Sequence, residues 1–134
     1  MKKIILLVLS LTLLSAASFA ENLILKNQTL YPGKNQKTRL AIQWANSAKQ
    51  VDAYNQSMIH GSKMDPDTMQ FLTQTGKVKL NIPQNAEYFR ILAWSTDTDQ
   101  PDHLTNWVDI VPNKTYTLKE EHLAPSVLIL GSGC

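Results

Sequence analysis

The segment from 58 to 69 gathers side chains of the kind that bind a soft metal ion. Its candidate ligands are Met58, His60, Met64 and Met69, which lie within twelve positions of one another. Thioether sulfur and imidazole nitrogen suit copper(I). The spacing matches no established metal motif, and methionine also fills irregular gaps in protein cores. Copper binding is therefore one hypothesis for these residues, and a purely structural role is the other.

A second group of ligand atoms lies in a polar segment further along the chain. Asp97, Asp99 and Asp102 supply three carboxylates, and carboxylate oxygens are preferred ligands of calcium. The segment has neither the glycine nor the distal glutamate of a calcium-binding loop. Asp-rich connections between strands are ordinary turns. Calcium is a second metal hypothesis, and a solvated turn is its alternative.

Patterns that support covalent or hydrolytic catalysis are absent from the sequence. There is no Gly-x-Ser-x-Gly stretch, which is the usual setting of a nucleophilic serine. The one cysteine, Cys134, is the last residue and follows Gly131-Ser132-Gly133, so we expect a flexible tail over 131–134. A thiol on such a tail has no base beside it; it either stays free or links two copies through a disulfide. We predict that the protein is not an enzyme and has no cofactor.

The N-terminus has the pattern of a cleavable secretory signal peptide. Lys2 and Lys3 precede an apolar run over 4–14, and small residues stand at Ser18 and Ala20. These are the charged, apolar and cleavage-site regions that a signal peptidase substrate requires. The apolar run is shorter than the roughly 20 residues that span a bilayer, and no later segment approaches that length. We predict cleavage after Ala20 and a periplasmic or secreted location.

The chain after the leader is small and electrically balanced. Two of the 13 Lys and Arg residues lie in the leader and all 11 Asp and Glu residues follow it, so residues 21–134 carry no formal net charge. Nucleic-acid binding is disfavoured, because it relies on clustered positive charge. The length suits one domain. With a single cysteine, that domain must be stable without an internal disulfide.

Hydrophobic alternation predicts an all-β fold. Several short runs alternate between apolar and polar residues and are bounded by turn residues. Short antiparallel strands of this kind favour a two-sheet sandwich over a helical or alternating α/β plan. The expected strands cover residues 23–25, 38–44, 77–82, 88–95, 107–111, 115–118 and 127–130.

The segment from 45 to 75 is the hardest to assign. Short strands around 51–54 and 58–59 are candidates, although polar residues interrupt both. Asp65 and Pro66 followed by Gly76 predict one short helix near 66–75, with Asp65 as the N-cap. A strand over 68–73 is the competing interpretation.

The turn at 111–116 resembles a feature of known sandwiches. Val111-Pro112-Asn113-Lys114-Thr115-Tyr116 is similar to the corner of immunoglobulin-like and fibronectin type III domains, in which a tyrosine bonds back to the main chain. The resemblance implies a sandwich of that outline with Tyr116 in the corner. It implies no activity, because one fold serves many functions.

The strand over 88–95 carries the most suggestive side chains. Alternation places Phe89 and Ile91 on one face. If that face is the core, the opposite face presents an aromatic and guanidinium row of the composition that interfaces favour. We therefore predict an adaptor that binds an exported or envelope protein through this face or a nearby edge. The alternatives are that the 45–75 segment covers the row, or that its aromatic rings bind carbohydrate. The row consists of Tyr88, Arg90 and Trp94.

Overall fold

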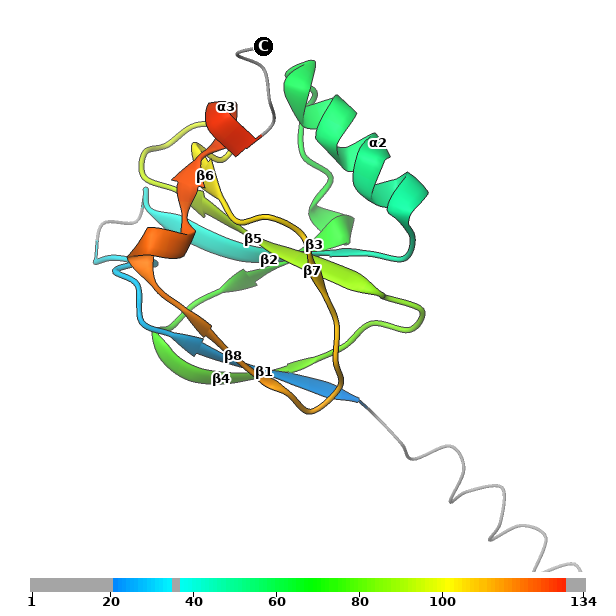
Figure 1. Ribbon diagram of the computed structural model, residues 1–134. Coiled ribbons are helices and arrows are strands. Elements are labelled where there is room, and N and C mark those ends of the chain that lie inside the picture. Colours follow the sequence, from blue (N-terminus) through cyan, green and yellow to red (C-terminus); the bar gives the residue numbers. More distant parts are fainter. Residues whose placement is uncertain (1–20, 35–36, 130–134) are drawn as a thin grey trace, which may run out of the picture.

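The protein is an all-β sandwich of two sheets, as the sequence predicts, and it has one substantial helix that the sequence analysis does not predict. The computed structural model describes residues 21–34 and 37–129 (Figure 1). The smaller sheet has the strand order β4-β1-β8, and the larger has the order β3-β2-β5-β6-β9, with β7 paired to β5. The strands are β1 (Asn22–Asn27), β2 (Arg39–Ala45), β3 (Met69–Leu72), β4 (Gly76–Asn81), β5 (Tyr88–Trp94), β6 (His103–Leu104), β7 (Val108–Asp109), β8 (Thr115–Leu118) and β9 (Ala124–Pro125).

The main core lies between the two sheets. Alternation along β2 and β5 directs one row of each strand inward, where Leu40 and Ile42 meet Phe89 and Ile91. Leu23 from β1 closes this core from the smaller sheet. All five side chains are buried. The alternation predicted for β5 is therefore confirmed.

Strand pairing departs from the prediction at one place. Every pair is antiparallel except β1 with β8, which run parallel over Ile24–Asn27 and Thr115–Leu118. The sequence contains no sign of this, because both strands are short and lie far apart in the chain. Strand bounds agree with expectation to within about two residues in β1, β2, β4, β5 and β8. The predicted strand over 107–111 is shorter, with only Val108 and Asp109 paired in β7.

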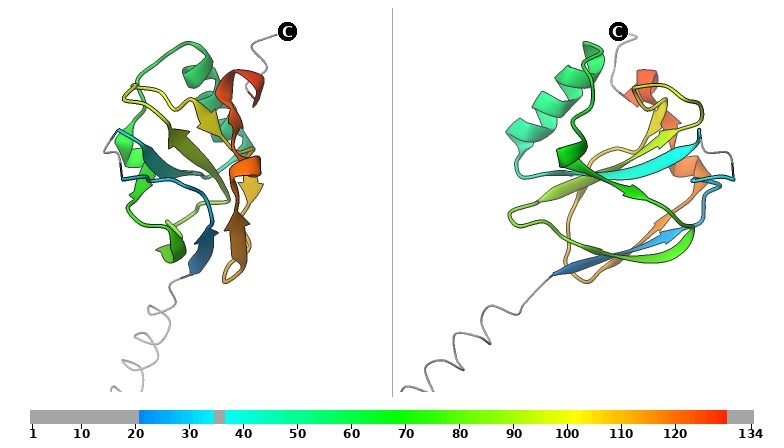
Figure 2. Two further views of the ribbon diagram at one scale, coloured as in Figure 1. Left: turned by 90° about the vertical axis from the view of Figure 1, so that its left-hand side faces the viewer. Right: turned by 180° about the vertical axis from the view of Figure 1, so that it is seen from behind.

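A second layer covers the outer face of the larger sheet. Helix α2 (Ala48–Ile59) lies across β2 and β5, on the side away from the smaller sheet (Figures 1 and 2). Met58 is the one buried residue of this helix. It packs in a separate cluster with Ala41, Leu92 and Trp94. The outer face of β2, where Ala41 and Gln43 lie, is therefore buried.

The ends of α2 explain why this polar segment is helical. The Ser47 side chain accepts a hydrogen bond from the Gln50 N–H at 3.1 Å, and the Gln50 side chain accepts one from the Asn46 N–H at 2.6 Å. These bonds satisfy donors that a helix leaves unpaired at its N-terminus. Gly61 follows the C-cap with φ of +74°, a conformation that glycine adopts without strain.

Three segment predictions are wrong. Residues 66–75 do not form a helix: a single 3-10 turn, η1 (Pro66–Thr68), leads into β3, as in the competing strand interpretation. The strands suggested around 51–54 and 58–59 belong to α2. The expected closing strand at 127–130 is instead a short helix, α3 (Ser126–Ile129), and Leu130 lies outside the described residues.

Several predictions concern residues outside the described ranges. These are the signal peptide over 1–20, the tail over 131–134 and the thiol of Cys134. Within residues 21–34 and 37–129, no helix is long and apolar enough to cross a bilayer.

Tyr116 bonds back to the main chain at the turn over 111–116. The Tyr116 hydroxyl accepts a hydrogen bond from the Val111 N–H at 3.0 Å and donates one to the Asp109 carbonyl at 3.0 Å. Its ring packs edge-on against Phe89, with centroids 4.9 Å apart. The side chain therefore fixes the turn before β8 and closes the end of the core.

Removing this hydroxyl should cost measurable stability. We expect Tyr116→Phe to lower the free energy of unfolding by about 1–2 kcal/mol, because two main-chain groups lose their partner while the ring packing is kept. Urea denaturation measures the change. Tyr88→Phe is the matched control, since no described hydrogen bond involves the Tyr88 hydroxyl. Equal costs for the two variants would contradict the role assigned to the corner.

Candidate functional site

The row predicted on β5 is mostly covered. Arg90 and Trp94 are each 1 % exposed, and Tyr88 is half-buried. The cover comes from α2 and from Trp107, so the covered alternative is the arrangement found. Of the predicted row, Trp94 lines a surface hollow beside β3, whereas Arg90 lies in the interior.

Arg90 is the centre of a polar layer that joins α2 to the sheet. Its Nε donates to the Gln43 side chain at 2.7 Å, and its Nη1 donates to Asn55 of α2 at 2.8 Å. The guanidinium lies 4.4 Å from the centroid of the Trp107 ring, and Trp107 stacks on Tyr54. Trp107 is therefore half-buried above the guanidinium rather than a member of the main core.

No carboxylate among the described residues forms an ion pair with Arg90. Burial lowers the pKa of Arg90 to about 10, so the group is still charged at neutral pH. Its Nη2 is buried and has no protein hydrogen-bond partner in the described ranges. A buried charge held only by neutral amides and a ring depends strongly on each of these contacts. Arg90 thus attaches the helix to the sheet rather than offering a binding surface.

Five strands among the described residues are paired on one side only, and four of these outer strands have features that discourage pairing with another chain. Such features include lysines, proline and very short strands. On β4, Lys77 and Lys79 are exposed, and β7 has only two residues, the second of which is the exposed Asp109. On β9, a two-residue strand ends at Pro125, and β8 lies between Lys114 and Lys119.

The fifth outer strand, β3, has none of these features. Its sequence, Met69-Gln70-Phe71-Leu72, contains no charge and no proline. It pairs with β2 on one side only. In Figure 2 (right) it is the green strand at the margin of the larger sheet. Its other margin has the main-chain groups with which an extended segment can pair.

Phe71 is an exposed aromatic side chain on this free edge. It is 42 % exposed, and its ring lies 5.6 Å from that of Trp94, centroid to centroid. Arg39 of β2 covers the same Trp94 ring, with its guanidinium carbon 4.8 Å from the centroid. Arg39 also donates to the Thr98 carbonyl at 2.6 Å. Buried Trp94 therefore acts as a platform that holds Phe71 and Arg39 in place.

Two surface hollows lie beside Phe71 and Arg39. Phe71 and Arg39 are lining residues of both hollows. The larger hollow, of about 580 Å³, is also lined by Pro32, Lys34, Thr38, Leu40 and Thr73. The smaller hollow, of about 240 Å³, is also lined by Lys63, Met64, Met69, Trp94, Asp97 and Asp99. Among the described residues that line the larger hollow, Lys34 and Arg39 are the charged ones, so the hollow attracts negative charge. The charges of the smaller hollow balance.

Residues from three separate sequence hypotheses meet in the smaller hollow. Trp94 comes from the predicted interface row, Met64 and Met69 from the copper candidates, and Asp97 and Asp99 from the calcium candidates. Met58 is instead buried in the cluster beneath α2. His60 is exposed, and its Nδ1 lies 2.7 Å from the Gln56 carbonyl. Within the described ranges, no three His, Cys, Asp or Glu residues are placed to hold a metal ion together.

Asp102 differs from Asp97 and Asp99, because it forms hydrogen bonds within the fold and does not line the smaller hollow. Its carboxylate accepts a hydrogen bond from the Ser95 N–H at 2.8 Å and another from the Ser95 hydroxyl. Burial opposes ionisation of the carboxyl, but the two Ser95 hydrogen bonds and nearby His103 outweigh it and lower the pKa of Asp102. The residue thereby closes the loop between β5 and β6.

This arrangement predicts a pH-dependent contribution to stability. Because the folded-state pKa of Asp102 lies below its ordinary value of 3.8, the contribution is complete above that value. It is lost as the pH falls through the lower, folded-state pKa. We expect Asp102→Asn to destabilise the protein by about 1 kcal/mol at neutral pH, and the difference from wild type to vanish in acid. Denaturation midpoints measured from pH 7 downward test this, and a pH-independent difference would contradict it.

The sequence analysis did not identify Phe71 and Arg39, the two residues that line both hollows of the candidate site. Phe71 belongs to a four-residue strand with one inward residue, which is too short for alternation to identify. Arg39 stands at the start of a predicted strand, where its position over Trp94 has no sequence signal. The run of uncharged residues over 69–72 was the one available sign of an unprotected edge.

The arrangement of a free β3 edge, Phe71 and a positively charged hollow defines the candidate site. Comparisons of the chain with protein-family models, with curated proteins and with solved structures find no match.

Proposed function

We propose that this chain is an exported, non-enzymatic binding module that recognises an extended segment of another exported protein at the free edge of β3. The observation that carries the proposal is Phe71, exposed between two hollows on the one outer strand that lacks charge, proline and flanking lysines. Strand addition of this kind gains affinity from main-chain pairing and specificity from side-chain pockets.

The lining of the hollows indicates the chemistry of the partner. An added strand places alternate side chains on the same face of the sheet. One apolar side chain would lie beside Phe71, and a carboxylate would lie near Lys34 and Arg39 in the larger hollow. Charge complementarity of this kind contributes specificity and association rate more than affinity. The proposed partner segment is therefore extended, with apolar residues at alternate positions and at least one acidic residue.

Selection from a random peptide library on the immobilised protein tests this function. We expect enriched peptides to share alternating apolar residues with a nearby Asp or Glu. Lys34→Glu should weaken their binding by roughly two- to fivefold, the range of a single exposed ion pair. Lys79→Glu on β4 changes the net charge equally at the edge of the other sheet, and it should leave binding unchanged. Equal effects of the two variants, or enriched peptides without the pattern, would count against the proposal.

A further inference from the structure

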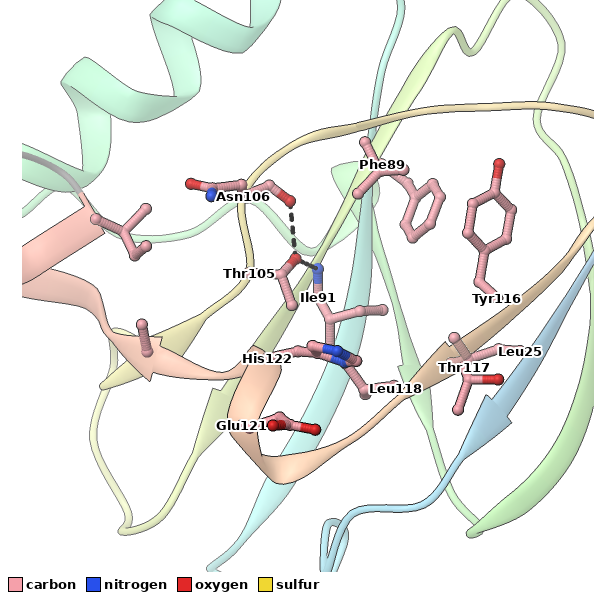
Figure 3. A pocket seen from close by; sticks show the side chains of 13 residues that line it. Leu25, Phe89, Ile91, Thr105, Asn106, Tyr116, Thr117, Leu118, Glu121 and His122 are labelled. Atoms are coloured by element: carbon pink, nitrogen blue, oxygen red, sulfur yellow. Dashed lines mark hydrogen bonds between the residues drawn. The ribbon is translucent and has the colours of Figure 1, made fainter.

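A cavity opens between the two sheets at the margin of β8. Its volume is about 450 Å³, which is within the range of small-molecule sites. Figure 3 shows side chains from β1, β5 and β8 around it. None of its lining residues lines the two hollows beside Phe71. It is therefore a separate feature of the molecule.

The interior of this cavity is apolar and belongs to both sheets. Leu25 and Leu118 line it from the smaller sheet, and Phe89 and Ile91 line it from the larger. These four side chains are at most 4 % exposed and belong to the main core, so they form the floor of the cavity. An apolar group that enters the cavity would extend the core, at a gain proportional to the apolar area removed from water.

A break in the β5 ladder leaves the sandwich open here. β6 ends at Leu104 and β7 begins at Val108. The Thr105 hydroxyl fills the gap in hydrogen bonding: it accepts from the Ile91 N–H at 2.9 Å and donates to the Asn106 carbonyl at 2.9 Å. The Thr105 N–H also donates to the Ile91 carbonyl at 3.0 Å, so both main-chain groups of Ile91 are satisfied at this margin of the cavity.

The margin of the cavity carries a hydrogen-bond donor that no described bond uses, and an acceptor from the neighbouring residue. His122 and Glu121 belong to η2 (Glu120–His122) and stand at the same margin of the cavity (Figure 3). The His122 Nδ1 accepts a hydrogen bond from the Lys119 N–H at 3.0 Å. In the neutral ring the proton is therefore on Nε2, which no described hydrogen bond uses. The Glu121 carboxylate offers an acceptor and repels anions.

We propose that this cavity binds a neutral amphipathic molecule with an apolar body and a hydroxyl head group. The body occupies the floor formed by Leu25, Phe89 and Leu118. The hydroxyl oxygen accepts from the Nε2–H of His122, and its proton is donated to Glu121. A carboxylate head group is disfavoured by Glu121, and an ammonium head group cannot accept from His122. The cavity thus discriminates by head group as well as by apolar surface.

Displacement of the neutral fluorescent probe N-phenylnaphthylamine by decanol, decanoate and decylammonium tests the proposal. We expect decanol to displace the probe at a lower concentration than either ion. Glu121→Gln should improve binding of decanoate by roughly two- to fivefold and leave decanol unchanged. Failure of the probe to bind, or equal displacement by the three compounds, would overturn the proposal.

Filling the cavity supplies a second test. Ala124→Leu adds bulk to a lining residue and should weaken decanol binding roughly tenfold, the loss expected when about two methylene groups are no longer buried. Ala53→Leu, on the exposed side of α2, is the matched control and should have no effect. Equal binding by the two variants would overturn the proposal. Phe71→Ala should leave decanol binding intact, which separates this site from peptide recognition at β3.

Discussion

Gln43→Leu is expected to lower the free energy of unfolding by about 2–4 kcal/mol. Gln43 is 2 % exposed and accepts the hydrogen bond from the Nε of Arg90. Leucine has a similar volume but cannot accept that bond, so a buried charge loses one of its few partners. The bond from Gln43 to Thr68 at 3.3 Å is also lost. Chemical denaturation measures the change, and Gln56→Leu on the exposed part of α2 serves as the control.

A double variant separates the loss of a partner from the loss of packing. In the Arg90→Met background the charge is absent, so Gln43→Leu should cost less than half of what it costs in the wild-type protein. The Asn55 side chain keeps one partner in that background, because Trp107 Nε1 still donates to it at 3.1 Å. If the two substitutions lower the free energy of unfolding additively, Arg90 and Gln43 act independently, and the hydrogen bond between them does not hold the polar layer together.

Phe71→Ala is expected to weaken the binding of selected peptides by roughly tenfold or more. Truncation of an aromatic residue at the centre of an interface commonly costs this much binding free energy. Phe71 and Arg39 line both hollows, so Phe71 lies at the centre of the proposed interface. Its side chain is 42 % exposed, so the free energy of unfolding should change by less than about 1 kcal/mol. Fluorescence anisotropy with a labelled peptide measures the affinity.

The control for this variant is another exposed apolar residue. Leu128 in α3 is 72 % exposed and lies outside the lining of both hollows. Leu128→Ala should bind the selected peptides as the wild-type protein does. If it weakens binding as much as Phe71→Ala, the effect reflects general surface apolarity rather than a site at β3.

The strands were predictable because their inner faces bury a continuous row of apolar residues. In β2 and β5 every second residue enters the core, and period-two alternation makes this visible in the sequence. Helix α2 gave no such signal, because Met58 is its one buried residue and a mostly polar helix has little periodicity. Its signs were local instead: the Ser47-x-x-Gln50 spacing of a capping box and Gly61 after the last turn.

The candidate site was predictable only in part. Apolar and aromatic residues on both faces of β5 showed that each face must be covered, and Trp94 does lie at the site. The sequence could not show that α2 rather than a partner supplies the cover, because this depends on where the helix lies in space. Asp65 and Pro66 fit the start of a helix and the start of a 3-10 turn equally well. The strand that follows, and Phe71 with it, became visible only in three dimensions.

Amide hydrogen exchange with and without a selected peptide tests the central claim most directly. Pairing of an extended segment with the free edge of β3 should slow exchange within 69–72, because main-chain groups at that margin become hydrogen-bonded. Exchange in β4, which is an outer strand of the smaller sheet, should stay unchanged. Slowed exchange confined to β4, β8 or α2, with β3 unaffected, would contradict the account.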